Sequence, residues 1–173
     1  MVFGERGGFG LEFHVERDPG LLCVDVFVGG LHVNAWDDAF YPPLLVKKLR
    51  DEVGRFREPA GPPGGFVSVG EAFRLAEGEW EGEWEGGASG AGGAESAACR
   101  FLDWGECTDG VLAFAFPDGE RVHLACRVHG DDGPGPSAAV TVRRTELLAT
   151  VEQGLDVAGR EWSARLAVLR ARD

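Results

Sequence analysis

Two series of short apolar runs, separated by turns rich in glycine and proline, constrain the fold of this chain more than any other feature. In the first series, apolar residues alternate with polar ones over 11–16, and Asp18-Pro19-Gly20 provides a turn. A second apolar run over 21–28 ends at Gly29-Gly30, and a third follows over 31–35. Because two glycines can adopt the positive φ of a tight hairpin turn, these runs predict three antiparallel strands.

The second series lies between residues 97 and 142. Apolar runs over 99–104, 111–116, 121–129 and 138–142 alternate with turn residues such as Asp109-Gly110. Within 121–129 the alternation predicts an inward face and an outward face. The inward residues are Val122, Leu124, Cys126 and Val128, and the outward residues are His123, Ala125, Arg127 and His129. This pattern predicts a β-meander.

Helical periodicity follows each series of strands. Leu45, Leu49, Val53 and Phe56 form one apolar stripe, with Asp37 or Asp38 as the expected N-cap. A second helix is expected from an N-cap at Thr145 to about residue 158, and a separate helical tail over 159–173, which is rich in arginine. Strands grouped together, without β-α-β alternation, predict an α+β class. We expect a single domain over 1–173, with an antiparallel sheet of hairpins and meander and two or three helices packed on it.

Residues 66–96 are harder to interpret. Phe66, Val67, Val69, Phe73 and Leu75 suggest one or two short strands. The segment 77–96 is rich in Gly and Glu and repeats GEWE, and its second half is nearly all Gly, Ala and Ser. Such a composition buries little apolar surface, so we expect a flexible insert whose beginning ends a strand, anchored by Trp80 and Trp84.

The charge of the chain limits its partners. The net charge is −12, which disfavours nucleic acid and anionic membranes as direct partners. The charge serves solubility, or it steers the chain toward a basic protein such as a toxin domain. The first residues lack the basic and apolar regions of a secretory signal, so we expect a cytoplasmic protein with reduced cysteines.

The sequence contains no G-x-S-x-G, P-loop, G-x-G-x-x-G or H-E-x-x-H motif. Cys99, Cys107 and Cys126 could approach one another across the meander as a zinc site requires, but His123 and His129 are too far apart along one strand to share a metal. We therefore predict no catalytic residue, no metal site and no cofactor.

Carboxylates leave one enzymatic alternative open. Asp37-Asp38 could cap a helix, and Asp103, Glu106 and Asp109 could be turn residues, but such carboxylates can also act as acid and base. The alternative is a domain, enzymatic or binding a small ligand, with its site near Asp103–Glu106. Trp104 and His123 belong to the group of residues to test.

Tryptophans next to acidic residues provide a second kind of candidate site. Such side chains anchor interfaces in some proteins and cover the core in others. The residues predicted to bind a protein partner are Trp80, Glu81, Glu83, Trp84, Trp104 and Glu106. The tail around Trp162 could mediate self-association, and we expect a monomer or a weak dimer.

The order of these elements resembles one family. The segments LLVKKLRDEVGRF (44–56), CRFLDWGECTDGVLAFAF (99–116), RVHLACRV (121–128) and VTVRRTELLATVEQGLDVA (140–158) carry the resemblance. Over residues 10–158 the arrangement is similar to that of the WapI-type immunity proteins and related uncharacterised actinobacterial proteins. The resemblance implies a bacterial, non-enzymatic interaction protein that binds and neutralises a toxin. It transfers no functional residue, and the insert 77–96 and the tail 159–173 depart from it.

Overall fold

The computed structural model describes residues 1–62, 68–84, 98–130 and 133–171, with only the backbone described for 79–84. Nine strands, three longer helices and a short 3₁₀ helix make up this part of the chain. Their bounds are β1 (Val2–Gly4), β2 (Phe9–His14), β3 (Leu22–Val28), β4 (Leu31–His32), β5 (Ala39–Phe40), α1 (Pro42–Arg57), α2 (Val69–Trp84), β6 (Arg100–Phe101), η1 (Glu106–Thr108), β7 (Val111–Asp118), β8 (Arg121–Gly130), β9 (Gly133–Arg143) and α4 (Arg144–Arg170).

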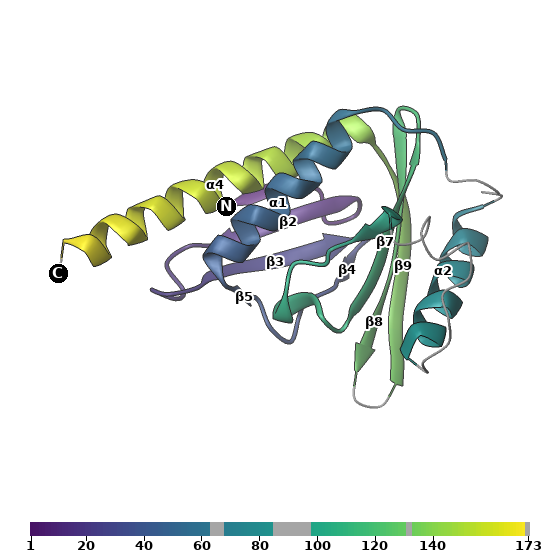
Figure 1. Ribbon diagram of the computed structural model, residues 1–173, viewed down its shortest axis with the longest axis horizontal. Helices are drawn as coiled ribbons and strands as arrows, with labels where there is room; N and C mark the ends of the chain where they lie inside the picture. The colour runs from purple at the N-terminus through teal and green to yellow at the C-terminus, as the bar shows by residue number, and fades with distance from the viewer. Residues whose placement is uncertain (63–67, 85–97, 131–132, 172–173) are drawn as a thin grey trace.

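The strands form two antiparallel sheets, which confirms the predicted α+β class (Figure 1). Sheet A has the order β1-β2-β3-β4, with β5 also paired to β3, and Leu11 lies opposite Val26 in its centre. Sheet B has the order β6-β7-β8-β9, which is the predicted meander. The two-residue strand β6 replaces the strand expected over 99–104, because the chain turns away at Leu102, whose φ is 59°.

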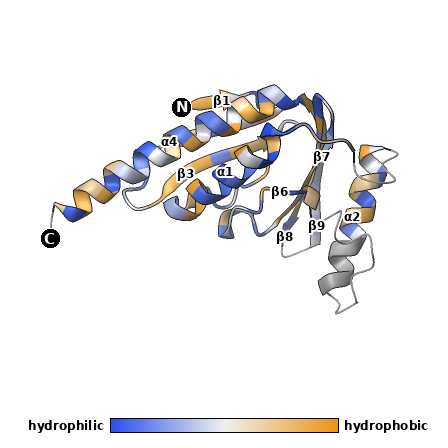
Figure 2. Cartoon of the chain, turned by 45° about the horizontal axis from the view of Figure 1, so that its top comes forward, coloured by the Kyte–Doolittle hydropathy of each residue, from blue (hydrophilic) through white to orange (hydrophobic). Residues whose placement is uncertain are grey.

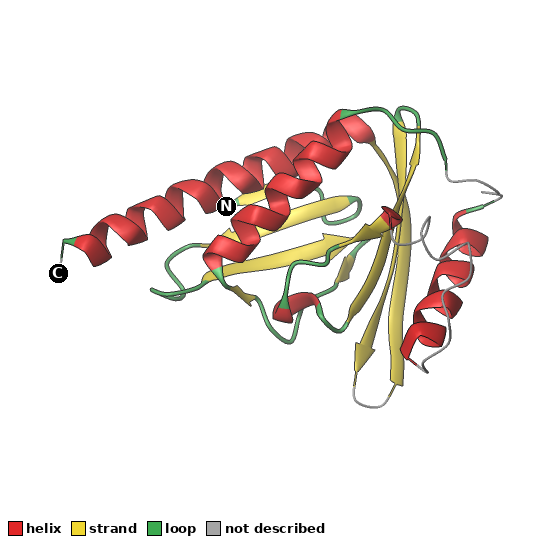
Figure 3. Cartoon of the chain, viewed as in Figure 1, coloured by secondary structure: helices red, strands yellow, loops and turns green. Residues whose placement is uncertain are grey.

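Helices α1 and α4 cover one face of sheet A and pack against each other (Figures 1 and 3). Hydrophilic and hydrophobic residues alternate along both helices, as their amphipathic patterns require (Figure 2). The prediction of two separate helices, divided before residue 159, is wrong, because α4 is one helix that continues to Arg170. Gly154 is buried where α4 crosses sheet A, and a Cβ at this position would lie 2.8 Å from Leu11 Cδ1. This glycine permits close helix–sheet packing.

The residues that cap helix α1 differ from those expected from the sequence. Its N-cap is Tyr41 rather than Asp37 or Asp38, and no side chain caps it. Pro42 occupies the first turn, where its missing N–H costs nothing. At the other end, Arg144 donates 3.1 Å hydrogen bonds to the carbonyls of Phe56 and Arg57. The last turn of α1 is therefore capped by the first residue of α4, whose own N-cap is Arg143 rather than Thr145.

The interpretation of 66–75 as strands is wrong, because Val69–Trp84 form helix α2. Ser68 Oγ accepts a hydrogen bond from the Glu71 N–H, as expected of an N-cap. Val69, Ala72, Phe73 and Ala76 follow a helical spacing and pack on the outer face of sheet B, beside Leu112, Phe114 and Phe116. The first part of the insert expected at 77–96 thus continues α2, and 85–97 lie outside the described residues.

One hydrophobic core takes residues from both sheets, α1 and α4. Among its largest buried side chains are Phe40, Phe101 and Trp104. Because α2 covers the other face of sheet B, β7 and much of β8 are buried on both sides, whereas β9 is half-buried or exposed. Ala125, predicted to point outward, is buried beneath α2. None of the described helices combines the length and the hydropathy that a bilayer span requires.

Candidate functional site

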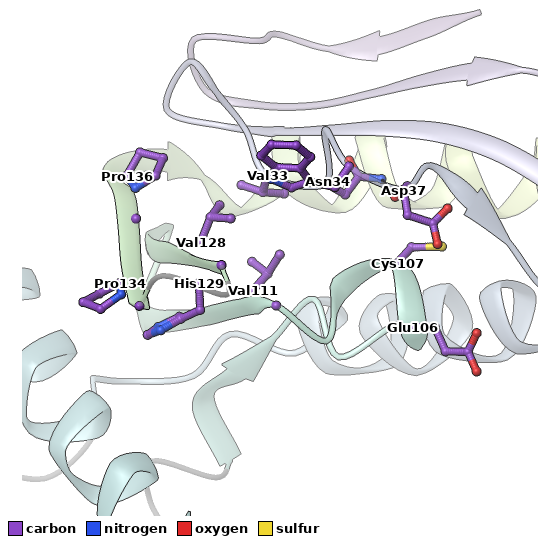
Figure 4. Close-up of a pocket in the computed structure, with 15 residues that line it drawn as sticks. Val33, Asn34, Asp37, Glu106, Cys107, Val111, Val128, His129, Pro134 and Pro136 are labelled. Carbon is purple, nitrogen blue, oxygen red and sulfur yellow. Dashed lines mark hydrogen bonds between the residues drawn. The ribbon is translucent and has the colours of Figure 1, made fainter.

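A cleft of about 650 Å³ opens where one end of sheet B approaches sheet A (Figure 4). Its walls come from the turn after β4, from η1, and from the adjoining ends of β7, β8 and β9. Val111 and Val128 point across the cleft toward Val33, so its interior is apolar. Pro134 and Pro136 of β9 form the end opposite η1.

A buried asparagine fixes the turn that forms the upper wall. Asn34 Oδ1 accepts the Val26 N–H, and its amide nitrogen donates to the carbonyls of Val24 and Asp37. The Asp37 N–H donates back to the Asn34 carbonyl at 3.2 Å, which closes a four-residue turn. Asp37 Oδ1 then accepts the Ala39 N–H at 3.0 Å. The backbone of this turn is therefore held at both ends by hydrogen bonds.

Trp36 lies in this turn, at the edge of the cleft, and is 91% exposed. An indole gains free energy when it is buried, and tryptophan is enriched among the residues that dominate protein–protein binding. Here an ordered turn holds a large aromatic side chain in water instead. This combination of a fixed backbone and an uncovered indole is typical of an interface anchor.

The side of the cleft formed by η1 is acidic. Asp37 and Glu106 line it together with Cys107, and no Lys or Arg occurs among its described lining residues. The Cys107 thiol lies beside the Asp37 carboxylate (Figure 4). Burial and this carboxylate raise the pKa of the Cys107 thiol to about 12. Cys107 therefore remains a protonated thiol, and the negative charge of this wall resides on the two carboxylates.

The structure separates the side chains that were predicted to bind a partner. Glu106 is exposed beside the cleft, whereas Trp104 is 1% exposed and packs against Phe40 and Phe101 in the core. The expectation that Trp104 meets a partner is not retained, because its ring is covered. Trp80, Glu81, Glu83 and Trp84 belong to the last turns of α2, and their side chains lie outside the described part of the chain.

The residues considered for catalysis do not converge. Asp103 pairs with Lys48 at 2.7 Å, whereas His123 hydrogen-bonds Thr141 at 2.8 Å. Asp38 pairs with Arg17. Lys48 also lowers the pKa of the Asp103 carboxyl, mainly through their hydrogen bond. These groups have different partners and form no common acid–base arrangement.

The cysteines considered for zinc lie apart as well. Cys126 faces the main core, whereas Cys99 belongs to the cluster under α2 on the other face of sheet B. Within the described ranges, no group of three or more His, Cys, Asp or Glu side chains is placed to hold a metal ion.

A buried ionic pair beneath Trp104 was missed by the sequence analysis. Glu52 of α1 is 9% exposed and pairs with Arg55 one turn later. Burial raises the pKa of Glu52 to about 6, although Arg55, the Trp104 indole N–H and Lys48 all favour the ionised carboxylate. Trp36 was not among the residues predicted to bind a partner, although it also lies next to an acidic residue, Asp37, and between the turn-forming residues Asn34 and Asp37.

Comparison with known proteins gives one informative match. No protein-family model and no curated protein sequence matches the chain. Among solved structures, CdiI from Burkholderia dolosa AUO158 superposes with a TM-score of 0.61 at 16% sequence identity. The match covers 90% of this chain and 99% of the other, so the two proteins share a fold over nearly their whole lengths.

Proposed function

We propose that this protein is a cytoplasmic immunity protein that binds and neutralises a protein toxin made by its own cell, without catalysing a reaction. The observation that carries the proposal is the fold shared with CdiI, an immunity protein of contact-dependent inhibition. A fold alone does not fix a function, so the site must support the proposal independently. The cleft supports it with an uncovered tryptophan and two carboxylates on an ordered frame.

The charge of the chain fits a basic toxin. At a net charge of −12 the molecule attracts a cationic partner over distances set by the ionic strength, which raises the association rate. An immunity protein has to meet its toxin before the toxin meets its target, so fast association is useful. We expect a 1:1 complex with a monomer or weak dimer of this chain.

The test is protection from the product of the neighbouring gene. A candidate toxin domain, sought in the gene next to that of this protein, is induced in a heterologous bacterium with and without this protein, and growth is measured. The proposal predicts that this protein restores growth and co-purifies with the toxin domain. Failure to restore growth, with no complex formed by the two purified proteins, would overturn it.

Small-ligand binding at the cleft is the second candidate, because Glu106 of the alternative site lines it and its volume lies in the range of ligand pockets, about 300–1,000 Å³. Mass spectrometry of the protein under native conditions checks this alternative. A small molecule that is retained at one copy per chain and lost in Glu106→Gln would favour it over toxin binding.

A further inference from the structure

Three properties of the cleft restrict what can occupy it. The first is the geometry of Trp36, whose indole is uncovered while the Asn34 hydrogen bonds hold the turn that carries it. Little conformational entropy of the backbone is lost when a partner covers such a side chain, because the turn is already ordered. The indole presents its aromatic face to incoming groups, and a cation is attracted to such a face.

The second property is the sign of the charge around the cleft. Asp37 and Glu106 come from different elements but lie on the same side of the cleft, and Asp109, just after η1, is also exposed. Arg17 pairs with the neighbouring carboxylate, Asp38, and not with Asp37. Asp37 and Glu106 therefore lie at the η1 end of the cleft without a Lys or Arg among its described lining residues.

The third property is the sequence of β9 where it borders the cleft. Pro134 and Pro136 lack the backbone N–H that an added strand would need for pairing. Prolines on an edge strand discourage pairing with another chain. The occupant is thus recognised here through its side chains.

We infer that the cleft is the partner-binding surface and that it takes a basic segment of the partner protein, with an Arg or Lys side chain stacked on Trp36 and basic groups of the segment paired with Asp37 and Glu106. This inference rests on the proposed function and adds to it the position of the interface and the chemistry of the partner. The aliphatic stem of the same side chain, or an apolar neighbour, lies against Val33, Val111 and Val128. Arginine suits this site best, because its planar guanidinium can stack and pair at the same time.

A peptide titration followed by NMR tests this inference without a toxin. The probes are three acetylated pentapeptide amides in which arginine, glutamine or glutamate alternates with leucine. The observed signal is the indole N–H of Trp36, assigned by its loss in Trp36→Phe. The arginine peptide is expected to shift this signal saturably, and the shift should weaken at 0.5 M salt, where charges are screened beyond about 4 Å.

Two double variants separate local charge from total charge. Asp37→Asn with Glu106→Gln removes the cleft carboxylates, and Asn keeps the oxygen that accepts the Ala39 N–H. Asp156→Asn with Glu16→Gln removes two exposed acids outside the cleft. The first pair should weaken binding of the arginine peptide about fivefold or more, and the second less than about twofold. Equal shifts with the glutamate peptide, or equal losses in both double variants, would overturn the inference.

Failure of the proposed binding surface can be distinguished from failure of the proposed immunity function. If the toxin is neutralised by wild type and equally by a variant that lacks Trp36 and both carboxylates, the function stands and the surface is wrong. If the arginine peptide binds as expected but no toxin is neutralised, the surface stands and the proposed function is wrong.

Discussion

Two tryptophans show how differently two regions of this molecule are built. Trp104 lies in the closed core, which we define as α1, α4 and the sheet faces that they cover, and its ring contacts Phe40 and Phe101. Trp36 lies at the open cleft and has almost its whole surface in water. Packing against Phe40 and Phe101 accounts for the aromatic ring of Trp104, whereas no contact among the described residues requires an aromatic side chain at Trp36. The contrast suggests that the closed core stabilises the chain and that the cleft is available for binding.

The largest expected difference is in the free energy of unfolding, when one side chain is truncated in the closed core and one at the cleft. Leu49→Ala removes a fully buried side chain of α1 and should lower the free energy of unfolding by about 3 kcal/mol. Trp36→Ala removes an exposed side chain and should change it by less than about 0.5 kcal/mol. Urea unfolding followed by far-UV circular dichroism measures both values. A comparable loss in Trp36→Ala would show that the cleft also carries stability.

The second prediction concerns Arg144, which caps the last turn of α1 at the edge of the closed core. Arg144→Ala removes the hydrogen bonds to the last carbonyls of α1 and should cost about 2 kcal/mol, because charged donors in a mostly buried setting are strong. Arg143→Ala is the matched control, since that side chain is largely exposed and pairs only with Glu146 along the helix. Its cost should be much smaller than that of Arg144→Ala, because solvent screens an exposed pair. Equal costs in thermal or urea unfolding would contradict the capping role.

Glu52 makes the closed core sensitive to pH. Its pKa rises from 4.5 to about 6 on folding, so the folded state binds this proton more tightly than the unfolded chain does. Stability contributed by the neutral carboxyl is present below pH 4.5 and is lost as the pH rises through 6. The loss amounts to about 2 kcal/mol.

The variant Glu52→Gln isolates this contribution, because glutamine does not titrate. The free energy of unfolding of the variant minus that of wild type should rise by about 2 kcal/mol between pH 4.5 and pH 7. Urea unfolding at several pH values gives this difference directly. A difference that does not change with pH would show that Glu52 has an ordinary pKa.

The smallest effect concerns the acidic wall of the cleft. Asp37→Asn removes a carboxylate that raises the pKa of Cys107, so the thiolate fraction at pH 8 should increase. Alkylation of Cys107 by iodoacetamide, followed by peptide mass spectrometry, should then be roughly threefold faster than in wild type. The control is Asp156→Asn, which lies outside the cleft and should leave the rate unchanged. An unchanged rate in Asp37→Asn would argue against the contact seen between the two side chains.

The closed core could be largely predicted from the sequence, because buried residues repeat with the period of their element. Leu45, Leu49 and Val53 indicated α1 in this way, and the alternation around Leu124 indicated β8. Helix α2 was missed although Val69, Ala72, Phe73 and Ala76 have helical spacing, because β-branched and aromatic residues were interpreted by their strand propensity.

The cleft could not be predicted, because its residues share no period and meet only in three dimensions. Trp36 and Glu106 are seventy positions apart in the sequence and come from turns that packing brings together. Trp104 and Glu106 lie two positions apart, yet one is in the core and the other faces solvent. Proximity in the chain therefore grouped residues that the fold separates.

The affinity of this protein for the toxin domain that it is proposed to neutralise tests the central claim most directly. Isothermal titration calorimetry compares wild type with Trp36→Ala, and with Tyr41→Ala as a second exposed aromatic side chain outside the cleft. We predict a 1:1 complex in which Trp36→Ala raises Kd by about tenfold or more, while Tyr41→Ala changes it by less than about twofold. Tight binding that is equal in all three proteins would contradict the assignment of the cleft as the interface.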